Sequence, residues 1–161
     1  MRNRRFYPAV LLAVMVLPVL ASGQQLTIQD ESGKQTILAR ADLEALPRAK
    51  ITAGSSSSSA TFEGVALDRV LEKAGVGLGE TMKGKRMASY LLVDAADGYR
   101  VLFALPEIDP AFTDKRVVLA FLKDGKPLDA KEGPYRIVVP DEKRMARWVR
   151  QVTTLKIVAA P

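Results

Sequence analysis

The sequence predicts one α+β domain with a mixed, mainly antiparallel β-sheet and few short helices. Segments with strand-like alternation outnumber segments with helical spacing. Asp-Gly pairs at residues 97–98 and 124–125 each lie between apolar segments, which is the pattern of tight hairpin turns. No strand–helix–strand repetition runs along the chain, so a parallel α/β sheet is not expected.

The domain is expected to begin with a hairpin and a short helix. Apolar and polar side chains alternate at residues 26–28 and 36–38, on either side of the polar segment 30–34. Asp42 is expected to cap the helix, because its carboxylate can accept a hydrogen bond from a free backbone N–H, and Pro47 stops it.

The run of serines at residues 55–59 is interpreted as a surface loop. Only a brief strand around Ile51 precedes it, and a polar, flexible composition of this kind is typical of loops. Apolar segments continue on both sides of the run. We therefore expect a loop within one domain and not a linker between two.

The clearest helical pattern begins at Leu67. Together with Val70, Leu71 and Ala74 it forms an apolar stripe at the spacing of one helix face. Gly75 follows as a C-terminal stop, since glycine readily adopts the left-handed conformation that ends many helices.

The C-terminal half alternates expected strands with turns. The segment 117–122 is apolar on both faces, so it should be a central strand. Short helical turns are expected within residues 106–112 and 142–147. The other strands are expected at residues 90–93, 99–105, 135–139 and 153–158.

The N-terminal residues have the pattern of a secretory signal peptide. Three arginines within the first five residues precede an apolar stretch at 9–17, and the small residues Ala21 and Gly23 suit signal peptidase. The apolar stretch is short for a membrane span. We expect residues 1–23 to be removed and 24–161 to form one periplasmic or secreted domain without stable membrane insertion. An uncleaved anchor is the alternative.

The charge of the chain argues against a nucleic-acid partner. The net charge is +6, and loss of residues 1–23 removes three arginines and no acid, which leaves 21 basic and 18 acidic residues and a net charge of +3. The basic residues are dispersed and are not interleaved with aromatic ones, as they are on nucleic-acid-binding surfaces.

Two residue types that carry much protein chemistry are absent. Without cysteine the chain has no disulfide, thiolate ligand or cysteine nucleophile, and without histidine it lacks the commonest nitrogen ligand and a Ser-His-Asp triad. We therefore expect neither a catalytic residue nor a metal ligand in this chain.

Short motifs nevertheless follow one another in a recognisable order. They are DLEALP at 42–47, FEGVAL at 62–67, DGY at 97–99, KDGKPL at 123–128, GPYRIVVP at 133–140 and RWV at 147–149. The series resembles the DLxxLP, W/F-x-G-V-x-L, DGY, NGxPL, GxPxRxVVP and KWL/KWV motifs of the oxidoreductase molybdopterin-binding domain of sulfite-oxidase-type enzymes. The resemblance implies that domain's fold and allows molybdopterin as a ligand.

The chain departs from this family at the metal ligand. The resemblance implies that one cysteine thiolate between the first two motifs binds molybdenum, but residues 48–61 contain serines and no cysteine. Serine ionises far less readily than cysteine and is a harder ligand. We expect no bound molybdenum. The alternatives are a serine-held metal at residues 55–59, with Ser55 as a cofactor-binding candidate, and a metal held by the pterin alone.

Arg136 is the first candidate for ligand binding. It lies in an apolar strand, where a charge is costly unless it is paired or faces a ligand. Three alternatives remain open: a donor to a pterin phosphate or other small anion, an outward-facing residue, or a buried pair with an acid such as Asp97.

The resemblance adds Arg147, Asp97 and Tyr99 as cofactor-binding candidates. Arg147 either completes an anion site or belongs to a solvated basic face packed on Trp148, which is itself expected in the core. Asp97 and Tyr99 are explained by turn formation and packing before any ligand is invoked.

Three hypotheses for function follow. The first is an exported, non-catalytic module that binds a small anion or a pterin and needs no cofactor. The second is a molybdenum-cofactor-dependent oxidoreductase of sulfite-oxidase type. The third is a periplasmic partner of a membrane redox or sensory protein, with the basic C-terminal segment as its contact.

Overall fold

The first β-sheet contains the two ends of the domain. The computed structural model describes residues 24–55 and 58–160, and its first sheet has the strand order β2-β1-β10-β5-β6. Neighbouring strands are antiparallel except β1 and β10, which pair in parallel. The strands are β1 (Gln25–Gln29), β2 (Gln35–Ala39), β5 (Tyr90–Ala95), β6 (Arg100–Ala104) and β10 (Val152–Val158).

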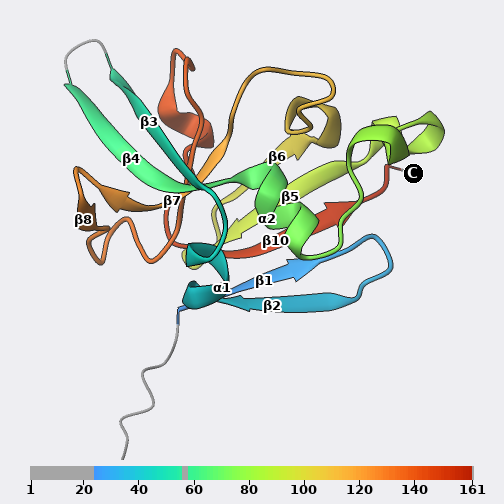
Figure 1. The fold of residues 1–161 in the computed structure, drawn as a ribbon, viewed down its shortest axis with the longest axis horizontal. Coiled ribbons are helices and arrows are strands. Elements are labelled where there is room, and N and C mark those ends of the chain that lie inside the picture. The colour runs from blue at the N-terminus through green and yellow to red at the C-terminus, as the bar shows by residue number, and fades with distance from the viewer. Residues whose placement is uncertain (1–23, 56–57, 161) are drawn as a thin grey trace, which may run out of the picture.

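The second β-sheet is antiparallel throughout and is centred on β7. The strand β7 pairs with β4 on one edge and with β8 and β9 on the other, so it is central, as its apolar sequence predicts. The β3–β4 hairpin extends away from the rest of the molecule (Figure 1). The strands are β3 (Arg48–Ser55), β4 (Ser58–Ala66), β7 (Val118–Lys123), β8 (Lys126–Pro127) and β9 (Arg136–Val138).

The helices are short, in agreement with the sequence. The α-helices are α1 (Arg40–Glu44) and α2 (Leu67–Lys73), and the predicted apolar stripe of α2 is buried at Leu67, Val70 and Leu71. Single turns of 3-10 helix interrupt the connections. They are η1 (Gly79–Thr81), η2 (Gly84–Ala88), η3 (Leu105–Glu107) and η4 (Met145–Arg147).

One hydrophobic core joins the two sheets and α2. Its buried side chains include Ile28 of the first sheet, Leu71 of α2 and Leu119 of the second sheet. The observed architecture confirms the predicted α+β class with mixed, mainly antiparallel sheets.

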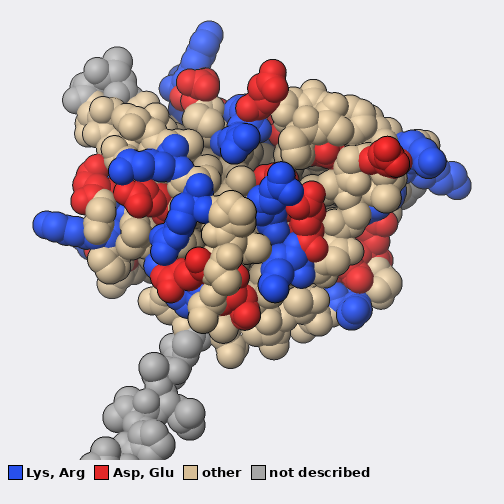
Figure 2. Space-filling view, viewed as in Figure 1, with Lys and Arg blue, Asp and Glu red and all other residues tan. Residues whose placement is uncertain are grey.

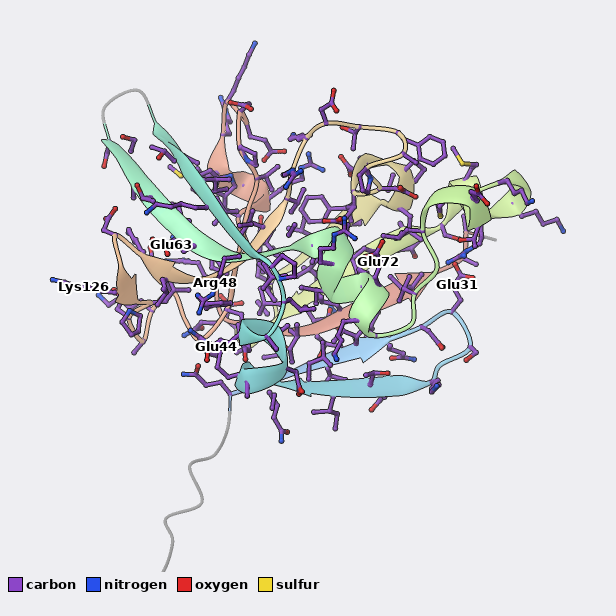
Figure 3. All side chains as sticks on the ribbon, viewed as in Figure 1. Glu31, Glu44, Arg48, Glu63, Glu72 and Lys126 are labelled. Atoms are coloured by element: carbon purple, nitrogen blue, oxygen red, sulfur yellow. The ribbon has the colours of Figure 1, made fainter. Side chains whose placement is uncertain are left out.

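Charged side chains cover the outer surfaces. Glu63 and Lys126 project from the second sheet and Glu72 from α2 (Figure 3). Acidic and basic residues alternate over the visible face without a continuous basic stripe (Figure 2). Among the described residues, none of the helices is long and apolar enough to cross a membrane.

The interpretation of the serine run as a loop was wrong at its two ends. Ser55 is the last residue of β3 and pairs with Ser58, the first residue of β4. The hairpin continues outward from the apolar pair Ile51 and Phe62, because each further backbone pair satisfies N–H and C=O groups whatever the side chains are. Residues 56–57, like the expected signal peptide at 1–23, lie outside the described residues.

The predicted role of Asp42 was also wrong in position. The helix α1 begins one turn earlier, after Ala39, so Asp42 lies inside its first turn. Its carboxylate accepts a hydrogen bond from the backbone N–H of Ala39 at 2.8 Å, which still stabilises the start of the helix.

Candidate functional site

Arg136 is buried within the second sheet. It lies in β9, opposite Ala120 of β7, and is 8% exposed. Its guanidinium carbon lies 5.4 Å from the ring centres of both Phe62 and Trp148. These aromatic neighbours remove the cation from water, which makes an ionic partner necessary.

The partner of Arg136 is Glu132. Nη1 of Arg136 donates to Oε1 of Glu132 at 2.5 Å. The same carboxylate accepts weaker hydrogen bonds from Nζ of Lys123 at 3.3 and 3.4 Å. Of the three alternatives for Arg136, the structure therefore favours the buried ion pair, but the suggested acid, Asp97, was wrong.

The ion pair borders a pocket of about 360 Å³. Three of the sequence candidates, Asp97, Tyr99 and Arg136, line it together. Its two carboxylates and two arginines leave the lining without net charge. The lining residues are Asp97, Tyr99, Glu132, Arg136, Met145, Ala146, Trp148 and Arg150.

The Asp97–Tyr99 turn forms one wall of this Arg136 pocket. The carboxylate of Asp97 accepts from the backbone N–H of Tyr99 at 2.9 Å, as expected for a turn. The hydroxyl of Tyr99 donates to the carbonyl of Ala146 at 2.7 Å, so the β5–β6 turn is tied to η4. Tyr99 is nevertheless 48% exposed, so part of its surface remains accessible at the pocket.

One donor inside this site has no protein partner. Nε of Arg136 is buried and donates to no atom of the described residues. Because buried polar groups are normally hydrogen-bonded, a ligand acceptor or a water is expected to supply the missing partner.

Trp148 belongs to the core, as the sequence predicts. It is 6% exposed, its indole N–H donates to the carbonyl of Val139 at 2.9 Å, and its ring meets Phe62 edge to face. It contributes a rigid apolar edge to the pocket.

Arg147 does not reach the Arg136 pocket. It hydrogen-bonds to Glu142 and, at 3.1 and 3.2 Å, to Glu107, and its guanidinium lies over the ring of Phe103. Desolvation lowers the pKa of Arg147, but its hydrogen bonds with the two glutamates together raise the pKa above its usual value. The sequence interpretation of a solvated arginine packed on Trp148 was wrong, because two carboxylates and a different aromatic ring surround it.

Ser55 is not among the residues that line this pocket. Its backbone ends β3, while its side chain lies outside the described part of the chain. Within residues 24–55 and 58–160, no group of three or more acidic residues could hold a metal ion.

Sequence reasoning missed two acidic residues that organise the site and its surroundings. Glu132 precedes Arg136 by four positions, but the ion pair was not predicted, because a turn separates the two residues. Asp109 is 1% exposed, and its carboxylate accepts from the backbone N–H groups of Gly79 and Ala111. The sequence predicted only a short helical turn within residues 106–112, which include Asp109.

Comparisons with known proteins agree with the motif series. Residues 15–161 match the family described as the oxidoreductase molybdopterin binding domain, and the chain therefore belongs to this family. No curated protein gives a significant match. Among solved structures, a chain of the sulfane dehydrogenase SoxCD from Paracoccus pantotrophus superposes with a TM-score of 0.64 at 24% identity.

The match to that structure concerns the fold. It covers 83% of this chain but 38% of the other, so this chain spans well under half the length of the protein that it matches. The resemblance inferred from the motifs is confirmed at the level of family and fold.

The residues present do not fit a molybdenum-loaded cofactor with a protein ligand to the metal. The whole chain contains no cysteine and no histidine. A cofactor phosphate approaching Arg136 would also meet the carboxylate of Glu132, which repels it. The pocket itself offers both hydrogen-bond donors and acceptors without net charge.

Proposed function

We propose that this chain is an exported, non-catalytic binding module of its family whose Arg136 pocket holds a small ligand of pterin type. The observation that carries the proposal is the ion pair of Arg136 with Glu132 beside Asp97 and Tyr99. The ion pair gives the site polar groups that can recognise a ligand. It also removes the excess positive charge that binding of a free anion would require.

A neutral, polar ring suits this pocket better than phosphate or sulfate. Phosphate would have to displace Glu132 from Arg136 or accept its repulsion. A pterin ring carries donors and acceptors on one edge, which the Asp97 carboxylate and the Arg150 guanidinium at the pocket can pair. The exposed part of the Tyr99 ring offers a surface for stacking.

We propose that the chain is not catalytic because it lacks the side chains that usually bind a redox centre. A redox enzyme of this family needs a centre that stores electrons, and the chain supplies neither a thiolate nor an imidazole to hold one. Export is proposed from the signal-like pattern of residues 1–23, and a mature domain at 24–161 remains part of the same proposal.

Two measurements test the proposal. Elemental analysis of protein purified from its native host should find far less than one molybdenum per chain. Calorimetric titration should detect neopterin binding that weakens in Arg136→Met, with little binding of phosphate by either protein. Near-equimolar molybdenum with a reducible spectroscopic signal would instead establish the oxidoreductase hypothesis.

A protein partner is the second candidate function. Met145 is 46% exposed at the rim of the pocket, next to Tyr99, and the cations Arg144 and Arg150 are exposed beside them. An exposed apolar side chain with polar and charged neighbours is typical of a small docking surface. A photo-crosslinker at position 145 that captures one specific protein in the native host, together with no neopterin binding, would favour this function.

A further inference from the structure

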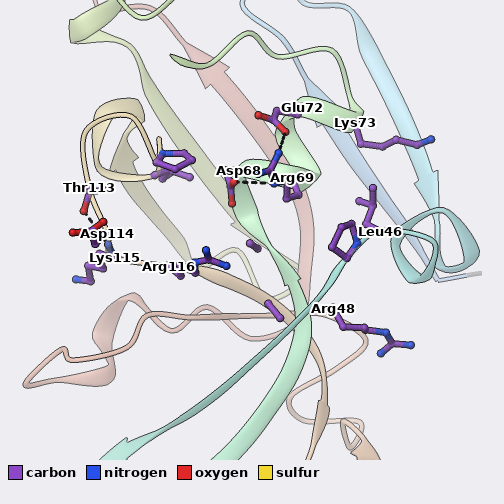
Figure 4. A pocket seen from close by; sticks show the side chains of 15 residues that line it. Leu46, Arg48, Asp68, Arg69, Glu72, Lys73, Thr113, Asp114, Lys115 and Arg116 are labelled. Carbon is purple, nitrogen blue, oxygen red and sulfur yellow. Dashed lines mark hydrogen bonds and ion pairs between the residues drawn. The ribbon is translucent and has the colours of Figure 1, made fainter. Parts of the chain in front are cut away.

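A second pocket, larger than the Arg136 pocket, lies away from it. It has a volume of about 640 Å³ and shares no lining residue with the Arg136 pocket. Its walls are the start of β3, one side of α2 and residues 108–116 (Figure 4). This volume lies within the range of small-molecule sites.

The α2 wall of this pocket carries two carboxylates and two cations, namely Asp68, Glu72, Arg69 and Lys73. Arg69 pairs with Glu72 at 2.9 Å and, less closely, with Asp68 at 3.4 Å. Arg69 is therefore the ion-pair partner of both carboxylates. Asp68 makes no side-chain hydrogen bond in the described part of the chain, so one of its oxygens can take a further donor.

The opposite wall carries a cation. Arg116 extends between the two walls, and it forms no ion pair with any residue that the structure describes (Figure 4). Asp114 and Lys115 lie on its outer side, and Lys115 pairs with Glu142 at 3.7 Å. Arg48 and Lys73 extend away from the centre of the view (Figure 4).

The space between the charged walls is apolar. Ala66 and Ile108 are buried there. The apolar lining residues are Leu46, Pro47, Ala49, Ala66, Ile108 and Pro110. A ligand body without charge would remove this surface from water.

We propose that this pocket binds a zwitterion with an apolar body, namely an apolar amino acid or a short apolar peptide. The ligand carboxylate pairs with Arg116, and its ammonium group pairs with Asp68. Its side chains cover Ala49 and Ala66. Arg116 and Asp68 have opposite charges on facing walls, and they are too far apart to form an ion pair with each other. A ligand with two charged ends can neutralise both of them.

The proposal is independent of the function proposed for the Arg136 pocket. NMR chemical-shift titration of the folded protein with leucine and with leucyl-leucine detects binding up to the millimolar range. Leucinamide lacks the carboxylate and N-acetyl-leucine lacks the ammonium group. Both should bind at least about tenfold more weakly than leucine, because each loses one charged hydrogen-bonded contact.

Matched variants test whether Arg116 and Asp68 bind the two charged ends of the ligand. Arg116→Gln should weaken leucine binding about tenfold or more, and Asp68→Asn should do the same. The controls Arg144→Gln and Asp141→Asn remove the same charges from exposed positions outside the pocket and should leave binding unchanged. Arg136→Met should also leave it unchanged, since Arg136 lines the other pocket.

Several outcomes would overturn the proposal. These are no shifts with leucine or leucyl-leucine, equal binding of leucine and its two blocked analogues, or equal binding by wild type and Arg116→Gln. Tighter binding of leucyl-leucine than of leucine would identify peptides as the ligand, and the reverse order would identify free amino acids. Neither result depends on whether neopterin binds.

Discussion

Glu132 neutralises Arg136 inside the pocket that the motif series predicts as a ligand site, with 2.5 Å between Oε1 and Nη1. The pair is asymmetric. Glu132 has a second cation, Lys123, within 3.3 Å, whereas Arg136 makes no ion pair with another described carboxylate. The two partners therefore differ in what their removal leaves behind.

Removing Glu132 should destabilise the protein more than removing Arg136. Glu132→Gln leaves a buried guanidinium without a counter-ion and should lower the free energy of unfolding by about 3 kcal/mol. Arg136→Met leaves Glu132 paired with Lys123 and keeps apolar contact with Phe62 and Trp148, so the loss should be smaller. Urea unfolding of both variants measures the order, and the reverse order would contradict the asymmetry.

Glycine should be required at position 64. The strand β4 has a register shift between Glu63 and Gly64, and a Cβ on Gly64 would lie 2.0 Å from the carbonyl oxygen of Leu119. Gly64→Ala should therefore cost about 3 kcal/mol or more, since backbone of the adjacent strand must move. Gly84→Ala is the control, because Gly84 has a positive φ but open space around it and should cost about 1 kcal/mol. Thermal unfolding of both variants tests the difference.

Asp109 should stabilise the connections around the larger pocket. Its buried carboxylate accepts from the N–H of Gly79 at 2.6 Å and of Ala111 at 2.9 Å. Asp109→Ala should lower the free energy of unfolding by about 2 kcal/mol, and the amide hydrogen of Gly79 should exchange faster. Asp114→Ala, at an exposed position nearby, should change stability by less than about 0.5 kcal/mol. Equal effects of the two changes would exclude this role.

Stability should fall at alkaline pH partly because of Tyr135. Burial raises the pKa of Tyr135 from 10.0 to about 12, and its hydroxyl donates to the carbonyl of Gln24 at 2.7 Å. A raised pKa stabilises the folded state below the unfolded value of 10.0, and that contribution is lost as the pH rises to about 12. Over this interval the free energy of unfolding should decline more steeply in wild type than in Tyr135→Phe. Parallel pH profiles would show that Tyr135 is not responsible.

Local patterns account for most of the correct predictions. The apolar stripe of α2, the Asp97-Gly98 turn and the central position of β7 depend on neighbours in sequence and on burial alone. The serine hairpin was misread because its strands are held by backbone pairing, to which side-chain composition is a poor guide.

The sequence by itself determined the family, the α+β class and the absence of thiolate and imidazole ligands, because these depend on residue types and their order. The tertiary structure alone decided which charges meet. Arg136 pairs with Glu132 and Arg147 with Glu107 and Glu142, although several acids lie near both arginines in the sequence. An ion pair needs approach within a few ångströms, and chain folding, not sequence spacing, brings the partners to that distance.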